Sequence, residues 1–291
     1  MMLFRVGVIG CGAIGSEICK AIDTDSFEGR TLGLNMRLSF LIDKHKEKIE
    51  NLCEQLKHPP AIKMCGSTAK DVRFDEILHE VDLVIECASQ SAVKEFVIPA
   101  LEAGKDVMIL SVGALAEEGM LERIEKIARE HRCDVYIPSG AIAGLDGLKS
   151  AAVSEIYEVR LTTRKPPAGF EGNRFVKEKG IDLAAVQKEG KPLVLFEGVA
   201  ADACRIFPEN VNVAASLSIA GIGARKTKVR VIADPRVREN THEIEVRGAF
   251  GSLCVRVENV PSPTNPKTSH LAALSAIATL KRISHPLKVG T

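Results

Sequence analysis

The chain has 291 residues, of which 45% are hydrophobic and 26% are charged, the composition of an ordinary globular protein with room for two modest domains. Its 39 basic and 38 acidic residues leave a formal net charge of +1, which argues against a nucleic-acid or membrane-surface partner. We expect a cytoplasmic protein, because no apolar run approaches the roughly 18 residues of a spanning helix and the eight cysteines are scattered without a CxxC pair.

Strands and helices alternate over the first half of the chain, from residue 3 to about residue 138. The predicted strands are short apolar runs at 3–10, 37–43, 81–89, 106–112 and 133–139. The helical segments that separate them lie at 16–22, 45–58, 91–104 and 117–131. Apolar strands that alternate with helices are typical of a parallel sheet covered on both faces. We therefore predict an α/β fold whose residues 1–138 form a Rossmann-type doubly wound parallel sheet that binds a dinucleotide.

A glycine-rich stretch, GCGAIG at 10–15, follows the first predicted strand and opens the first helix. Gly10 would allow the tight turn, Gly12 the close approach of a pyrophosphate, and Gly15 the packing of the helix against the strand. The amides at the start of the helix, at Ala13 and Ile14, would face the phosphates. The alternative is a turn that is glycine-rich for other reasons.

The second predicted strand ends at Asp43. An acidic side chain at this position accepts hydrogen bonds from the adenosine ribose and favours NAD, because it repels a 2′-phosphate. Lys44 and Lys46 follow it and leave use of NADP open, so the expected cofactor is NAD or NADP. A second role for Asp43, as the cap of the next helix, is compatible with both cofactors.

The alternation changes after Ser139. The pattern predicts a helix at 144–154, a half-buried strand at 156–166, a polar insertion at 169–192, helices at 201–207 and 211–221, and strands at 226–234, 241–248 and 252–259. Residues 139–266 are therefore expected to form a second, substrate-binding domain of α+β type, built on a mainly antiparallel sheet. We expect the last segment, 267–291, to be helical and to pack back on the first domain.

His242 lies in the strand NTHEIEVRG, on the same side as Ile244 and Val246. A polar ring on an apolar strand face is explained either by a core histidine bonded to a backbone carbonyl or by an active site at that face. His270, in NPKTSHLAALS, is the second choice among the histidines for a catalytic role. No cluster of residues has metal-ligand spacing, so no metal is expected.

The chain resembles the L-aspartate dehydrogenase family in an ordered set of motifs that spans nearly its whole length. They are GCGAIG at 10–15, ECASQSAVKE at 86–95, SGAIAGLDGLKSA at 139–151, LTTRKPP at 161–167, LFEGVAADACRIFPENVNVAASLSIAG at 195–221, VRVIADP at 229–235, HEIEVRGAFG at 242–251 and NPKTSHLAALSA at 265–276. The segment 171–190 fits the family less clearly.

The resemblance implies oxidation of L-aspartate by NAD(P), through iminoaspartate, to oxaloacetate and ammonia, or supply of the imine for NAD biosynthesis. It implies that His242 is the active-site residue and that Ala141 and Asn212 contact the cofactor. Ala88 and Ser89 of the second motif are further expected cofactor contacts. A homo-oligomer, most simply a dimer, is the expected assembly.

Aspartate carries two carboxylates, so its pocket should contain cationic or hydroxyl donors. Thr162, Thr163, Arg164 and Lys267 are the candidates, together with Lys165, and each cation is alternatively a solvated charge.

The sequence is also compatible with three other functions. A homoserine dehydrogenase or a dihydrodipicolinate reductase-like enzyme shares the two-domain plan, although the chain lacks the paired-histidine motif expected of the latter. A non-catalytic dinucleotide sensor would keep the glycine loop without needing His242.

Overall fold

The computed structural model describes residues 3–207, 212–262 and 265–291. It divides into two compact units: the first comprises Met1–Pro138 and Ala273–Lys288, and the second comprises Ser139–Ala272 and Val289–Thr291. Within the described residues, no helix is both long enough and apolar enough to cross a membrane.

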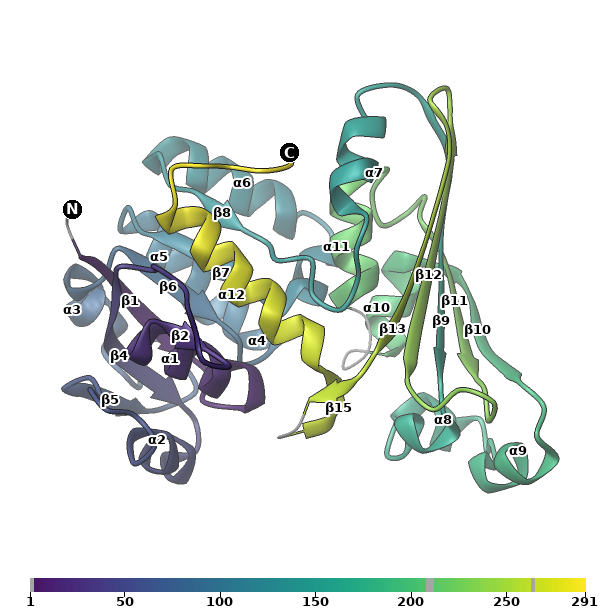
Figure 1. Cartoon of the computed structure of the whole chain (residues 1–291), viewed down its shortest axis with the longest axis horizontal. Helices are drawn as coiled ribbons and strands as arrows, with labels where there is room; N and C mark the ends of the chain where they lie inside the picture. Colours follow the sequence, from purple (N-terminus) through teal and green to yellow (C-terminus); the bar gives the residue numbers. More distant parts are fainter. Residues whose placement is uncertain (1–2, 208–211, 263–264) are drawn as a thin grey trace. The chain divides into compact units, whose positions relative to one another are not determined.

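The first unit is built on a six-stranded sheet whose neighbours are all parallel (Figure 1). In spatial order its strands are β5 (Ile62–Cys65), β4 (Met36–Asp43), β1 (Phe4–Ile9), β6 (Leu83–Glu86), β7 (Asp106–Ile109) and β8 (Val135–Tyr136). Counted along the chain, this is the order 3-2-1-4-5-6 of dinucleotide-binding sheets, and it reverses between β1 and β6. The predicted doubly wound parallel sheet is confirmed.

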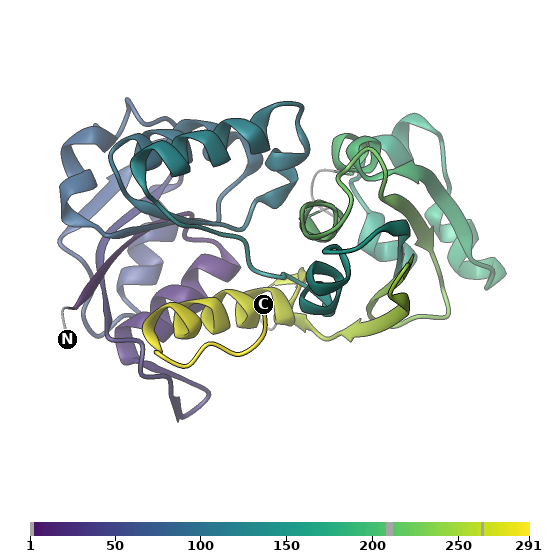
Figure 2. The same ribbon diagram turned by 90° about the horizontal axis from the view of Figure 1, so that it is seen from above.

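Helices cover both faces of this sheet (Figures 1 and 2). They are α1 (Ala13–Thr24), α2 (Lys46–Cys53), α3 (Phe74–Ile77), α4 (Gln90–Ala92), α5 (Ile98–Glu102), α6 (Met120–His131) and α12 (His270–Ser284), with helical turns η1 (Leu78–Glu80), η2 (Val93–Val97) and η3 (Val112–Ala116). One core joins Val6 and Val8 of β1 to Ile18 of α1 and Ile277 of α12. The chain's last helix thus packs with its first.

The second unit contains a five-stranded sheet. In spatial order its strands are β10 (Leu193–Val199), β11 (Lys228–Ala233), β9 (Ile156–Lys165), β12 (Asn240–Gly248) and β13 (Gly251–Asn259). The sheet is mainly antiparallel, as predicted, and the pair of β11 with β9 is parallel. A short ribbon of β14 (Pro261–Ser262) and β15 (Asn265–Ser269) follows.

The helical elements of the second unit are α7 (Leu145–Ala151), η4 (Pro167–Phe170), α8 (Arg174–Glu178), α9 (Leu183–Glu189), α10 (Ala200–Ile206) and α11 (Asn212–Ala220). Helices α7, α10 and α11 lie on one face of the second sheet, and α8 and α9 lie at one end of its strands (Figure 1). The central strand β9 alternates accordingly: Val159, Leu161, Thr163 and Lys165 are buried, and the residues between them are exposed or half-buried. Its covered face changes from apolar to polar toward the strand's carboxyl end.

The structure contains elements that the sequence pattern did not assign. Strand β5 is only four residues long, and β10 has an edge position with several exposed residues, so neither carries a clear periodic signal. The polar insertion contains α8 and α9, and a two-stranded ribbon, β2 (Ser26–Phe27) with β3 (Arg30–Thr31), lies in the loop between α1 and β4.

Candidate active site

The three glycines between β1 and α1 have three different surroundings. Gly10 has a φ of +102°, and a Cβ there would lie 2.7 Å from the backbone of Cys87. A Cβ on Gly15 would lie 1.9 Å from the Gly10 carbonyl oxygen, which ties α1 tightly to the end of β1. A Cβ on Gly12 would meet nothing within 4 Å. The space over Gly12 is therefore the one through which a ligand can approach this backbone.

Helix α1 begins at Ala13, with Gly12 as its N-cap and no side-chain cap on its first amides. Uncapped amides and the positive end of the helix dipole make this end suited to an anion. Ala13 and Ile14 form the first turn, so the helix begins three residues before the segment 16–22 that the sequence pattern predicted. The loop fits the pyrophosphate of a dinucleotide.

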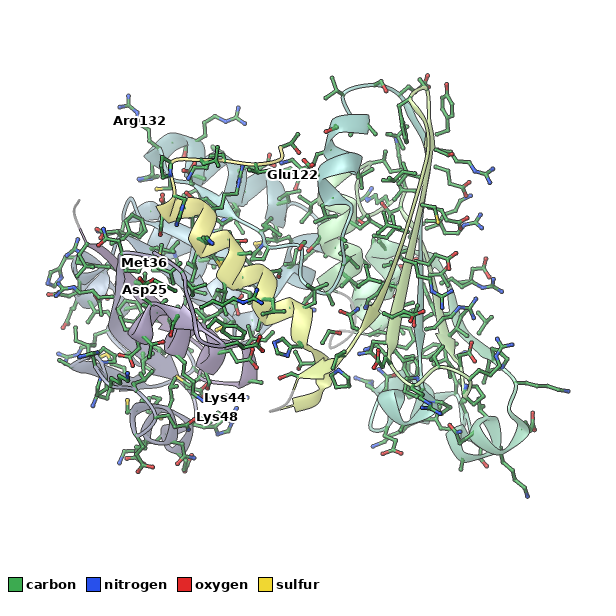
Figure 3. The ribbon with its side chains drawn as sticks, in the orientation of Figure 1. Asp25, Met36, Lys44, Lys48, Glu122 and Arg132 are labelled. Carbon is green, nitrogen blue, oxygen red and sulfur yellow. The ribbon has the colours of Figure 1, made fainter. Side chains whose placement is uncertain are left out.

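Asp43 ends β4 and is buried beside this loop. Its Oδ2 accepts a hydrogen bond from the Cys11 amide at 2.8 Å, and its Oδ1 accepts one from the His45 amide at 2.8 Å. The carboxylate is thus fixed in position and also holds the glycine loop. Lys44 and Lys48 come from the segment that runs from the end of β4 into α2 (Figure 3), and both are exposed.

The loop after β6 is attached to the glycine loop. The Cys87 thiol donates to the carbonyls of Ile9 and Gly10, at 3.2 and 3.1 Å. Ala88 and Ser89 follow it and are exposed, and the Ser89 hydroxyl caps α4 by accepting from the Ala92 amide at 3.2 Å. The expected cofactor residues of the first unit therefore lie at one edge of the sheet, where β1, β4 and β6 end.

His242 lies on β12 in the second unit, with 3% of its surface exposed. Its cross-strand partner on β9 is Thr163, whose Oγ1 lies 3.0 Å from Nδ1 of the ring. Burial, and secondarily the charge of Lys165, lowers the pKa of His242 to about 3. The ring is therefore neutral at physiological pH and is joined to a hydroxyl that either donates or accepts.

The structure separates the candidate carboxylate-binding residues of β9 between two faces. Thr163 and Lys165 are buried on the face that carries His242. Thr162 and Arg164 point to the opposite face by strand alternation, and Nη1 of Arg164 lies 3.2 Å from Asp234 Oδ2. The structure thus brings Thr163 together with His242, and it does not bring Thr162 or Arg164 there.

Ala141 lies in the turn that follows the first unit, and its position is fixed by a residue that the sequence did not single out. The buried Asn259 at the end of β13 donates from Nδ2 to the Ala141 carbonyl at 3.0 Å and to the Asn240 carbonyl at 3.4 Å. Its Oδ1 is buried without a hydrogen-bond partner among the described residues. Because two carbonyls accept from Nδ2, the orientation of this amide is determined.

The other candidates lie elsewhere in the second unit. Asn212 is the exposed first residue of α11, and His270 is the first residue of α12. Lys267 belongs to β15, and its side chain is outside the part that the structure describes. Within the described residues, no group of three His, Cys, Asp or Glu side chains is arranged to hold a metal ion.

Two buried polar residues, Glu86 and Asn259, were missed by the reasoning from sequence. Glu86 gave a usable signal, because it is an acid that closes the apolar strand LVIE immediately before the loop of Ala88 and Ser89. Asn259 gave no such signal in the sequence, because polar residues are common at the ends of strands.

Two family models match the chain, one in each half. Residues 10–138 match the NAD-binding domain of homoserine dehydrogenase, and residues 146–283 match the C-terminal domain of aspartate dehydrogenase. The second match separates the chain from homoserine dehydrogenases, whose resemblance is confined to the nucleotide-binding half.

Curated relatives match over the full length. The chain is 52% identical to an L-aspartate dehydrogenase of Methanococcoides burtonii, over 99% of this chain and 100% of the relative, and 39% identical to one of Nitrosopumilus maritimus, over 99% of both. The solved aspartate dehydrogenase of Thermotoga maritima is 28% identical with a TM-score of 0.72 and covers 99% of both chains. The scyllo-inositol dehydrogenase of Lactobacillus casei, 15% identical with a TM-score of 0.53 over 99% of this chain and 91% of its own, shares the fold.

Proposed function

Because this chain belongs to the aspartate dehydrogenase family, we propose that it oxidises L-aspartate with NAD(P)⁺ to iminoaspartate, which water converts to oxaloacetate and ammonia. The substrate loses a hydride from Cα and protons from its nitrogen, so the balanced products are oxaloacetate, ammonium, reduced cofactor and one proton. Bound NAD(P)⁺ supplies the hydride acceptor. The first unit is assigned to the cofactor and the second to the amino acid.

The observation that carries this proposal is the buried, neutral His242. The ammonium group of aspartate must lose a proton before its nitrogen lone pair can form the C=N bond, and a neutral imidazole is able to accept that proton. A pKa of about 3 keeps the free enzyme's ring unprotonated, although it makes the ring a weak base. A dianionic substrate beside the ring favours its protonated form, so substrate binding itself raises the ring's basicity.

Thr163 sets which ring nitrogen is available. We assign the hydrogen bond as Nδ1–H donating to Thr163 Oγ1, because this tautomer leaves the lone pair of Nε2 for the substrate. After hydride loss the ring releases the proton taken from the substrate ammonium to solvent, which is the proton among the overall products, and is then able to take a proton from the water that attacks the iminium carbon. Thr163 is thus a positioning residue in this scheme.

For the substrate carboxylates we propose Lys165 rather than Arg164 or Thr162. Lys165 is buried on the face of His242 and its charge acts on the ring, whereas Arg164 is paired with Asp234 on the other face. A carboxylate that pairs with Lys165 would also offset the charge that depresses the pKa of His242. Lys267 stays a candidate for the second carboxylate.

For the cofactor we propose contacts at Gly10, Gly12, Ala13, Ile14 and Gly15 for the pyrophosphate, at Asp43 for the adenosine ribose, and at Ala88, Ser89, Ala141 and Asn212. We propose a preference for NAD, supported by the carboxylate fixed at the end of β4.

The variant Asp43→Ala tests this preference. The substitution frees the Cys11 amide and should weaken the binding of both NAD and NADP. It also removes the repulsion between the carboxylate and the 2′-phosphate of NADP, so the ratio of kcat/KM with NAD to kcat/KM with NADP should decrease. An unchanged ratio would contradict the preference.

The imine is either hydrolysed on the enzyme or released toward NAD biosynthesis, and trapping of free imine separates the two. We propose a homodimer as the simplest homo-oligomer. Light scattering of the purified protein measures the oligomer.

The experiment that tests the function is a screen of amino acids with NAD⁺ and with NADP⁺, followed by the absorbance of the reduced nicotinamide. We expect turnover with L-aspartate and none with D-aspartate or homoserine. Turnover with homoserine alone would assign a homoserine dehydrogenase. Turnover of a dihydrodipicolinate-type imine alone would assign that reductase class, and cofactor binding without any turnover would assign a dinucleotide sensor.

A further inference from the structure

Glu86 is a fully buried carboxylate that the proposed reaction does not use. It is the last residue of β6, with 0% of its surface exposed, and its three predecessors on the strand are apolar and buried. An ionisable group in this setting is costly unless hydrogen bonds satisfy it. The surroundings of Glu86 therefore have to explain its presence.

Four donors from two loops converge on this carboxylate. Its Oε1 accepts from the amides of Ala88 and Ser89 at 2.8 and 3.0 Å and from the Ser111 hydroxyl at 2.8 Å. Its Oε2 accepts from the Ser111 amide at 3.1 Å. Burial raises the pKa of Glu86, and each of these donors opposes that shift. Glu86 thus joins the loop that follows β6 to the loop that follows β7.

The two loops lie in the second half of the doubly wound sheet. In such sheets each half binds one mononucleotide, at the carboxyl ends of the strands and next to the point where strand order reverses. The adenosine half is the one with Asp43 at the end of β4, because that acid faces the adenosine ribose. The half that contains β6 and β7 is left for the nicotinamide mononucleotide.

Glu86 is buried, whereas two of the residues whose amides it binds are exposed, and this difference indicates its structural role. Ala88 and Ser89 are exposed at the sheet edge, and the carboxylate that holds their amides is completely buried. Their backbone is therefore fixed from below while their outer surface stays open to a ligand. Preorganised backbone of this kind lowers the cost of ordering a loop when a ligand binds.

We propose that Glu86 is a positioning residue for the nicotinamide half of the cofactor, because it holds the loops after β6 and β7 in one binding arrangement. This inference rests on the proposed NAD(P)-dependent function. It assigns to Glu86 no contact with the cofactor, and it predicts that the two halves of the cofactor respond differently when the carboxylate is removed.

The test compares the binding of NADH with that of ADP-ribose, which lacks the nicotinamide, by calorimetry on the full-length protein. For Glu86→Ala we expect the Kd of NADH to rise about 10-fold or more, because the two loops must then be ordered at the expense of about 1.4 kcal/mol of binding free energy or more. The Kd of ADP-ribose should stay at the value of the unaltered protein. Binding is measured without L-aspartate, so the result does not depend on turnover.

Two milder substitutions keep the proposal testable if Glu86→Ala fails to fold. Glu86→Gln keeps an oxygen for Ala88, Ser89 and the Ser111 hydroxyl but turns an NH₂ toward the Ser111 amide, so we expect an intermediate loss of NADH affinity. Ser111→Ala removes one hydrogen bond and should give the smallest loss. In both, ADP-ribose binding should be unchanged.

Asp82 offers a matched control at the opposite end of β6. Its carboxylate accepts from the amide and the guanidinium of Arg5 on β1, at 2.7 to 3.2 Å, so it also joins neighbouring strands. Asp82→Ala should lower the melting temperature without changing the Kd of NADH, because the amino edge of the sheet binds no cofactor.

The outcomes separate this inference from the proposed function. If the unaltered protein binds NADH and a folded Glu86→Ala binds it equally well, the role of Glu86 is overturned while the function stands. Equal weakening of NADH and ADP-ribose would also overturn it, because the effect would not be confined to the nicotinamide half. Failure of the unaltered protein to bind NADH would overturn both proposals.

Discussion

A histidine on the covered face of a sheet has to be either neutral or paired with a charge, and His242 is neutral. Its ring is 3% exposed, and Thr163 rather than a carboxylate is bonded to Nδ1. A carboxylate partner would have raised the ring's pKa, whereas burial and the nearby Lys165 lower it. The site thus keeps its proposed base unprotonated until an anionic substrate arrives.

This protonation state predicts a specific dependence of stability on pH. The pKa of His242 falls from 6.5 to about 3 in the folded state. Below pH 6.5 His242 is protonated in the unfolded chain but stays neutral in the folded chain. Its titration therefore lowers the free energy of unfolding as pH falls from 6.5 toward about 3, and it has no such effect at higher pH.

The measurement is urea unfolding of the protein and of His242→Gln, which lacks the titrating group. Relative to the variant, the unaltered protein should lose roughly 1.4 kcal/mol between about pH 7.5 and about pH 5.5, because each pH unit is worth that amount once the unfolded histidine titrates. A stability difference that stays constant over this range would mean that His242 protonates freely in the folded state.

Thr163 provides a second prediction at this scale. Thr163→Val keeps the shape and removes the hydroxyl that fixes the ring's tautomer, so kcat should fall about 10-fold, while Thr163→Ser should keep most of the activity. The readout is kcat against KM for L-aspartate. A fall in melting temperature with unchanged kcat in Thr163→Val would reduce the hydroxyl to a packing role.

At the residue scale, the sequence pattern predicted which face of a strand a side chain lies on, but it did not predict which residue on a neighbouring strand that side chain contacts. The alternation in NTHEIEVRG placed His242 with Ile244 and Val246, and all three are buried. The pairing of β12 with β9 that brings Thr163 to His242 depends on register, which no local pattern specifies. The roles of these residues stay predictions.

At the scale of elements, the turn from β1 into α1 is the most closely determined by its sequence. Each glycine there answers a different physical demand: the positive φ of Gly10, the contact of Gly15 with the Gly10 carbonyl, and the open space over Gly12. The order strand, glycine loop, helix was predictable because all three signals are local.

These differences predict opposite effects for two substitutions in one loop. Gly12→Val fills open space and should abolish binding of NADH with little change in melting temperature, because the protein itself offers no clash. Gly15→Ala places a Cβ 1.9 Å from the Gly10 oxygen and should lower the melting temperature clearly. Fluorescence titration and thermal unfolding measure the two effects. Unchanged NADH affinity in Gly12→Val would place the phosphates elsewhere.

The strands that the sequence pattern did not predict are those with a weak hydrophobic periodicity. Strand β5 is short and contains no fully buried residue, and β10 runs along the edge of its sheet. In both cases the hydrogen bonds of a neighbouring strand, rather than a hydrophobic period, define the element. The parallel pairing of β11 with β9 is likewise a property of the chain's path and not of either strand's residues.

At the scale of the whole molecule, the chain combines a nucleotide-binding unit of common design with a second unit that carries the family's distinguishing features. The family matches divide in the same way, since residues 10–138 match a domain of homoserine dehydrogenase and residues 146–283 match aspartate dehydrogenase. Cofactor binding is therefore expected to be general to the fold, and we propose that the second unit determines which amino acid is oxidised.

The proposed mechanism depends most on His242, and the kinetics of two variants test it directly. The measurement is kcat for L-aspartate in the unaltered protein and in His242→Ala and His242→Asn, together with the Kd of NADH for each. We predict that kcat falls about 100-fold or more in both variants, the range of a lost general base, while the Kd of NADH stays unchanged. A folded His242→Ala enzyme with near-normal kcat would contradict the account, return His242 to the core and move the search to His270.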